Sequence, residues 1–135
     1  MVDQQQEARL QVVEAPEDCG NAPRKIVIRD FLIALYQQDE DHVLEALAED
    51  IRWELVGSRV LNGLEEVREW LRREPPVREL HIAMVITHGT DCGVDGWVVY
   101  ADGRTRALSH VLIFAGHAKS AKIKALRSYL IDISG

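Results

Sequence analysis

Glu54 is the residue whose surroundings most suggest chemistry. It is the carboxylate of a short, otherwise apolar strand predicted over residues 51–56, which ends before Gly57. In such a setting a carboxylate can be a general base, a buried structural group or a residue on a solvated face. As a structural group it would pair with Arg52 or Arg106, and the residue types alone leave these alternatives open.

Two further basic side chains, Arg106 and His110, lie on one strand of a predicted hairpin. Residues 101–104, Ala-Asp-Gly-Arg, predict a two-residue turn that pairs Val99 with Arg106 and Asp95 with His110. Alternation then predicts a pocket-lining face of large, mostly apolar side chains: Trp97, Val99, Arg106, Leu108, His110, Leu112 and Phe114. The opposite face holds small and β-branched residues and predicts a sheet-packing or subunit face: Val98, Ala107, Ser109, Val111 and Ile113, with Tyr100 and Thr105 near the turn.

Both basic residues also have structural interpretations. A histidine on an apolar face is often a hydrogen-bonded core residue, and Arg106 either anchors a ligand carboxylate or offsets the charge of Glu54. His81 and His88 are seven residues apart on an extended strand and point to opposite faces, so no shared metal is predicted. The sequence contains no Ser-His-Asp elbow, glycine-rich phosphate loop or HExxH motif, and no metal or other cofactor is expected.

Three helices and five strands are predicted to position these side chains. The first helix begins at Asn21 and Pro23 and ends near Tyr36, and the second is capped by Asp39 or Asp41 and closes at residues 49–50. The third runs from residues 62–63 to the prolines at 75–76. From residue 77 the period changes to 2, and four strands follow: VRELHIAMVITH, GWVVY, TRALSHVLIF and AKIKALRSYLIDI.

The order of elements predicts one α+β domain over residues 22–135, preceded by a flexible extension over residues 1–21 with a short turn at 10–13. A chain of 135 residues that is 47% hydrophobic suits a single soluble domain, and its apolar runs are too short to span a membrane. The net charge of −6 argues against a nucleic-acid binder. The start MVDQQQEARL shows no secretory signal, so a cytoplasmic location is expected, with Cys19 and Cys92 as free thiols.

Several passages together resemble the NTF2-like superfamily, in its SnoaL-like and ketosteroid-isomerase-like branch, over residues 24–133. They are QQDEDHVLEALAEDIRWELVG, the helix start at Gly63 and the closing LRSYLID at 126–132. The resemblance implies a cystatin/NTF2-like cone, in which three N-terminal helices pack on a curved, mostly antiparallel sheet. It also implies a deep apolar pocket inside the cone and a homodimer built from the outer sheet face.

The resemblance implies roles for particular residues. Glu54 stands three residues before Gly57, the position of the isomerase base, and His110 takes the position of the hydrogen-bonding acid. A histidine there would donate to a developing enolate oxygen or act as the acid in a dehydration. Phe31 takes the place of the family's tyrosine and has no donor. Limonene-epoxide hydrolases carry a catalytic triad at the positions of Leu108, His110 and Ser128, where it is absent from this chain. Epoxide hydrolysis is therefore not expected unless Arg106 and Asp132 rebuild the triad from other positions.

These expectations combine into two hypotheses. The first is a cofactor-independent isomerase, cyclase or dehydratase acting on a small hydrophobic, polyketide-like or steroid-like molecule, in which Glu54 and His110 converge on one cavity. Its expected ligand-binding residues are Phe31, Trp53, Trp97, Arg106, Leu108, Leu112, Phe114, Leu126 and Ser128. The alternative is a non-catalytic small-molecule-binding or dimeric assembly module of the same fold.

Overall fold

The computed structural model describes residues 10–14 and 23–134. Its helices are α2 (Pro23–Gln37), α3 (Glu40–Ala46) and α4 (Gly63–Arg73). Its strands are β1 (Gln11–Glu14), β2 (Leu47–Leu55), β3 (Arg59–Asn62), β4 (Val77–His88), β5 (Asp91–Tyr100), β6 (Thr105–Phe114) and β7 (Ile123–Asp132). The predicted α+β class, with helices first and a long antiparallel meander after them, is confirmed.

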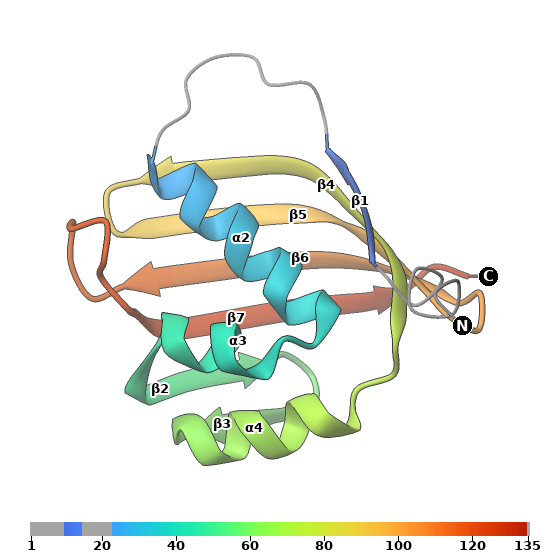
Figure 1. Ribbon diagram of the computed structural model, residues 1–135, viewed down its shortest axis with the longest axis horizontal. Helices are drawn as coiled ribbons and strands as arrows, with labels where there is room; N and C mark the ends of the chain where they lie inside the picture. The colour runs from blue at the N-terminus through green and yellow to red at the C-terminus, as the bar shows by residue number, and fades with distance from the viewer. Residues whose placement is uncertain (1–9, 15–22, 135) are drawn as a thin grey trace.

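One seven-stranded sheet forms the scaffold, in the order β1-β4-β5-β6-β7-β2-β3. Strands β4 to β7 are antiparallel neighbours, whereas β1 pairs parallel with β4 and β2 pairs parallel with β7. Helix α2 runs across one face of this sheet, and α4 lies beside β2 and β3 at its lower edge (Figure 1). The helices therefore cover the inner face, and the opposite face of β4 to β7 is left open.

The buried residues of helix α2 agree with the hydrophobic period of its sequence. Ile28, Phe31, Leu32 and Leu35 recur at helical spacing, and all four are buried against the sheet. Tyr36 comes four residues after Leu32 and so shares this buried face. The helix begins at Pro23 as predicted, and the predicted cap Asn21 lies outside the described residues.

One boundary differs from the predictions, and two short strands are additional to them. Helix α3, capped by Asp39, ends at Ala46, because Leu47 adopts extended backbone angles and opens β2 several residues early. The four-residue strand β3 was not predicted, and it pairs with β2 after the turn at Gly57. A short turn is predicted at residues 10–13, but residues 11–14 form β1, in which Val12 and Val13 pair with β4. The other residues of the predicted extension lie outside the described part of the chain.

The predicted hairpin register is wrong by one residue. The turn spans residues 101–104, with Tyr100 N donating to Arg104 O at 2.8 Å and the Asp102 carboxylate accepting from Arg104 N at 3.0 Å. Trp97 therefore pairs with Ala107, and Val94 pairs with His110. A one-residue slip exchanges the two faces of β5 relative to β6. Val98 and Tyr100 thus lie on the inner face, and Trp97 lies on the outer one.

Candidate functional site

His110 lies at the centre of the inner sheet face. It is in register with Val94 on β5 and Ser128 on β7, and it is 1% exposed. Its Nδ1 is 2.6 Å from Ser128 Oγ, and its Nε2 is 2.7 Å from Tyr36 Oη on α2. Trp53 Nε1, from β2, donates to Ser128 Oγ at 2.8 Å. Four buried side chains from four elements thus form one hydrogen-bonded chain, called here the polar relay: Trp53, Ser128, His110 and Tyr36.

The relay borders a cavity of about 390 Å³, including its open mouth. Its walls come from the C-terminal ends of α2 and α4 and from the inner face of β2, β4, β5, β6 and β7. The lining residues are mostly apolar: Leu35, Tyr36, Gln38, Leu55, Trp70, Leu71, Glu74, Pro75, Val77, Tyr100, His110, Ser128 and Leu130. The enclosed part is narrow, with room for about one water molecule. We call it the His110 cavity.

Burial governs protonation in this cavity. Desolvation lowers the pKa of His110 to about 4, because the imidazolium form is disfavoured away from water. Desolvation also raises the pKa of the Tyr36 hydroxyl well above its ordinary value, and the nearby Glu74 carboxylate raises it further. At neutral pH the relay therefore carries a neutral imidazole and a protonated phenol.

Glu74 is the carboxylate that lines the cavity. It follows the last turn of α4, where Gln38 Nε2 donates to the carbonyl oxygens of Leu71 and Glu74 at 3.2 and 2.7 Å. Desolvation raises the pKa of Glu74, and the positive charge of Arg106 acts in the opposite direction. A desolvated carboxyl with a raised pKa, on the wall of a cavity, is a candidate for proton exchange with a ligand.

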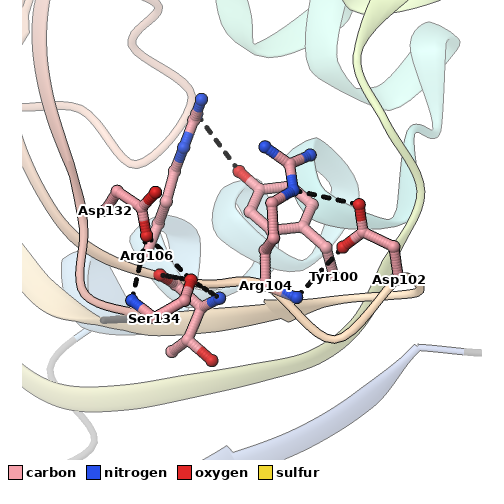
Figure 2. A network of polar contacts seen from close by, with 7 residues as sticks. Tyr100, Asp102, Arg104, Arg106, Asp132 and Ser134 are labelled. Carbon is pink, nitrogen blue, oxygen red and sulfur yellow. Dashed lines mark hydrogen bonds and ion pairs between the residues drawn. The ribbon is translucent and has the colours of Figure 1, made fainter.

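The hairpin end carries a network of polar side chains around Tyr100, which lines the cavity, and Figure 2 shows this network. Arg106 Nη1 donates to Tyr100 Oη at 3.3 Å, and its guanidinium lies 5.5 Å from the centre of the Tyr100 ring. Arg104 pairs instead with Asp102, and Asp132 accepts from Ser134 (Figure 2). Arg106 is thus placed behind a cavity-wall tyrosine and close enough to influence Glu74.

The structure does not bring Glu54 and His110 together. Glu54 alternates with the buried residues Trp53 and Leu55 and is in register with Arg127, on the outer face. Its side chain is 37% exposed and lies 3.7 Å from Arg52 Nη1. The convergence expected from the sequence is therefore not observed. Its physical cause is the alternation of β2, in which Trp53 and Leu55 take the inner positions.

The other expected ligand-binding residues are distributed over several places. Ser128 lines the His110 cavity, and Trp53 is buried and donates to Ser128. Arg106 does not line the cavity but donates to the cavity-wall residue Tyr100. Leu108, Leu112 and Leu126 are buried core residues that do not line the cavity.

Two aromatic residues expected in the pocket, Phe31 and Phe114, line a separate open hollow of about 840 Å³ between α2, α3 and the loop 115–122. Trp97 is 40% exposed on the outer face, where its ring stacks on His81 with centroids 4.6 Å apart. The register slip of the hairpin explains why Trp97 is not at the cavity.

Most lining residues of the cavity are not among the site residues predicted from the sequence, and three of these carry an ionisable group: Tyr36, Glu74 and Tyr100. The helical spacing of Tyr36 from Leu32 already placed it on the buried face of α2. Glu74 directly precedes two prolines, which mark the end of α4 and hence the mouth of a pocket formed by helix ends. Tyr100 needed the correct hairpin register.

Within residues 10–14 and 23–134, no cluster of three or more His, Cys, Asp or Glu side chains could hold a metal ion. In the same part of the chain, no helix has both the length and the apolar character needed to cross a membrane.

The fold is similar to those of several solved structures. A ketosteroid isomerase-like protein from Kribbella flavida matches with a TM-score of 0.67 and 15% identity, over 80% of this chain and 77% of that one. An LEH-like epoxide hydrolase from M. tuberculosis matches with a TM-score of 0.64 and 22% identity, over 80% and 82%. An NTF2-like protein of unknown function from Burkholderia pseudomallei matches with a TM-score of 0.64 and 23% identity, over 79% and 89%.

The chain therefore has the NTF2-like fold, as its sequence predicted. No protein-family model matches the chain, and no curated protein matches its sequence. At these identities the structural likeness establishes the fold, and the chemistry has to be argued from the cavity itself.

Proposed function

We propose that the protein binds a small hydrophobic carbonyl compound at the His110 cavity and moves a proton between carbon atoms of that compound. The carbonyl oxygen would occupy the enclosed part, which has room for about one water molecule, and the carbon skeleton would lie in the open mouth. The proposal rests on one observation: two polar groups, Glu74 and Tyr36, line the same narrow and mostly apolar cavity. Glu74 supplies a desolvated carboxyl, and Tyr36 supplies a phenol that stays protonated. This pairing of a base with a hydrogen-bond donor is what proton abstraction next to a carbonyl requires.

The proposed reaction is an isomerisation with a balanced proton. The Glu74 carboxylate takes a proton from the carbon beside the carbonyl, and the electron pair of the C–H bond moves toward the carbonyl oxygen. Tyr36 O–H donates to that oxygen as it gains charge, which stabilises the enolate. The neutral Glu74 then returns the proton to a different carbon of the conjugated system. Neither a metal nor a redox cofactor takes part in these steps.

The base in this proposal is Glu74 and not Glu54. Glu54 is half-exposed and pairs with Arg52, so its carboxylate is solvated and has no path to a ligand in the cavity. His110 keeps a role in the proposal through its contact with Tyr36 and not as a proton donor to the ligand. The ketosteroid isomerase-like and epoxide hydrolase-like neighbours are consistent with small-molecule chemistry in this fold, and the SnoaL-like assignment belongs to the same proposal.

The test uses a small cyclic β,γ-unsaturated ketone, whose conversion to the conjugated isomer is followed by ultraviolet absorbance. Glu74→Gln should lower kcat/KM by about 10²-fold to 10⁴-fold because it removes the base, and Tyr36→Phe by about 10²-fold because it removes the donor. Glu54→Gln is the matched control and should retain full activity. A wild-type rate equal to the buffer rate, or equal losses in Glu54→Gln and Glu74→Gln, would contradict the proposal.

A second proposal concerns assembly, and the outer sheet face supports it. Exposed apolar side chains gather there on neighbouring strands: Met84 and Ile86 on β4, Trp97 on β5, and Tyr129 and Ile131 on β7. Strand β6 lies between them and contributes Ala107, Ser109, Val111 and Ile113 to this face. Val98 and Tyr100, predicted for the same face, are instead buried on the inner side. We propose that a second copy of the chain covers this face, because open apolar patches of this kind are typical of interfaces.

A further inference from the structure

The direction of each hydrogen bond in the polar relay can be worked out from its most constrained member. An indole N–H only donates, so at 2.8 Å Ser128 Oγ must accept from Trp53. The Trp53 side chain is completely buried, and its ring packs against Phe31 and Trp70, with centroids 6.2 and 5.1 Å away. The indole is therefore fixed in place, and Ser128 has to arrange its own hydrogen around it.

Ser128 then has one acceptor for its hydroxyl hydrogen among the described residues. Its Oγ contacts Trp53 Nε1 and His110 Nδ1, and only the ring nitrogen can accept. Each direction leaves one hydroxyl hydrogen without an acceptor among the described residues: that of Ser128 if His110 Nδ1 carries the hydrogen and Tyr36 donates to Nε2, and that of Tyr36 if Nδ1 accepts. Both hydroxyls line the cavity, but Ser128 is 2% exposed and Tyr36 is 8% exposed, and an unsatisfied donor costs more the more fully it is buried. The favoured direction therefore runs from Ser128 O–H to His110 Nδ1.

We infer that Trp53 and Ser128 are positioning residues that hold His110 in its Nε2–H tautomer, so that the Tyr36 hydroxyl hydrogen is directed into the cavity. A neutral imidazole has one N–H, and with Nδ1 accepting, that N–H is at Nε2 and donates to Tyr36 Oη at 2.7 Å. Tyr36 accepts this bond and cannot return its own hydrogen to His110. Its hydroxyl lines the cavity, which is where the hydrogen is free to point.

This direction defines the chemistry of the ligand group that meets Tyr36. The relay ends in an O–H donor, so the group must be an acceptor oxygen, such as that of a ketone or an enolate, and not an ammonium or an N–H donor. The catalytic meaning of this inference rests on the proposed function. The tautomer itself does not, because the relay is complete in the ligand-free protein.

The test is ¹⁵N NMR of the histidine rings in the full-length, ligand-free protein at pH 7. The expected result for His110 is one tautomer, with Nδ1 far downfield as the unprotonated nitrogen and the ring proton on Nε2. The opposite pattern, with the proton on Nδ1, would overturn the inference, even in a protein that turns over ketones. The expected pattern in a protein without turnover would leave the inference standing and contradict only the proposed function.

Variants then test the positioning role. Ser128→Thr keeps the hydroxyl and should keep the Nε2–H pattern, whereas Ser128→Ala removes the donor to Nδ1 and should give a mixture of tautomers. Circular dichroism establishes that both variants fold. As a cavity readout, binding of 4-nitrophenolate should weaken at least threefold in Ser128→Ala and stay at the wild-type value in Ser128→Thr. An unchanged tautomer together with unchanged phenolate affinity in Ser128→Ala would show that Ser128 is only a structural residue.

Discussion

His110 and Tyr36 are neutral at physiological pH for the same reason, which is that both are withdrawn from water. Desolvation lowers the pKa of the imidazole and raises that of the phenol, so neither group gains a charge when pH varies around 7. Glu74 is desolvated to a smaller degree, and Arg106 partly offsets the effect. The cavity thus contains one carboxyl whose pKa is shifted upward and two groups, the His110 imidazole and the Tyr36 phenol, that stay neutral at pH 7.

The buried imidazole leads to a prediction about stability. The pKa of His110 is about 4 in the folded protein and 6.5 in the unfolded chain, so between these values the unfolded chain binds more protons. The stability that His110 contributes is present above pH 6.5 and is lost as pH falls toward 4. A shift of this size corresponds to about 3 kcal/mol. Urea unfolding at pH 7, 5.5 and 4.5 measures the decline.

The control for this prediction is a comparison of two histidines. His110→Gln should remove most of the decline between pH 6.5 and 4, whereas His88→Gln should keep it, because His88 is exposed and its imidazole makes no hydrogen bond in the described structure. If both variants show the wild-type decline, the carboxylates and not His110 are responsible for it.

At the level of single residues, sequence reasoning found the centre of the site but not its carboxylate. The alternation of β6 identified His110, and the closing strand identified Ser128. Glu54 was chosen because it stands on an apolar strand, yet alternation places it opposite Trp53 and Leu55. The hydrophobic period of the sequence does not identify Glu74 as a cavity residue, because the position of its side chain depends on where α4 ends against the sheet.

At the scale of elements, the pairing of β4 with β5 depends on a glycine. The register of this pair shifts between Ile82 and Met84, opposite Gly96. There the backbone of β4 comes so close that a Cβ on Gly96 would lie 1.8 Å from His81 O. Only a residue without a side chain fits this contact.

Gly96→Ala should therefore destabilise the protein by about 3 kcal/mol, because β4 or β5 has to move to make room for the methyl group. The matched variant is Gly93→Ala on the same strand, where the nearest atom to a new Cβ, His110 O, is 3.8 Å away. That variant should change the free energy of unfolding by less than about 1 kcal/mol. Urea denaturation of both proteins measures the difference, and equal effects would show that the close contact is unimportant.

The elements were predicted better than their pairing. Helical and strand periods located α2, α4 and the four long strands, since each has a continuous apolar face. The hairpin register was missed because the local motif Asp102-Gly103 suggests a two-residue turn. The Asp102 side chain instead bonds to Arg104, which lengthens the loop. Local turn chemistry thus decided which face of β5 reaches the cavity.

At the scale of the whole molecule, one face of the sheet is covered and the other is open. Helices α2 and α4 lie on the inner side (Figure 1). On the outer side, His81, Trp97, Ala107 and Ile131 form one row across four strands. Three of these four side chains, Trp97, Ala107 and Ile131, are apolar, and they form a surface that a second chain can cover.

Light scattering of the wild-type protein should accordingly give the mass of a dimer of the 15.3 kDa chain. Val111→Lys, which introduces a charge at the centre of the outer face, should give a monomer. Ile26→Lys is the matched control, because Ile26 is 45% exposed on α2, away from the outer face, and it should leave the dimer intact. A dimeric Val111→Lys protein would exclude this face as the interface.

The three tryptophans lie where their fluorescence can report on the cavity and on the outer sheet face. Trp53 is fully buried in the relay, Trp70 forms part of the cavity wall, and Trp97 is 40% exposed on the outer sheet face. The rings of Trp53 and Trp70 are 5.1 Å apart, close enough to share excitation energy. Emission from this pair therefore responds to a molecule entering the cavity, and emission from Trp97 responds to events on the opposite face. In a Trp97→Phe variant the remaining emission follows ligand entry alone, and its difference from the wild-type emission follows events on the outer face, without any attached dye.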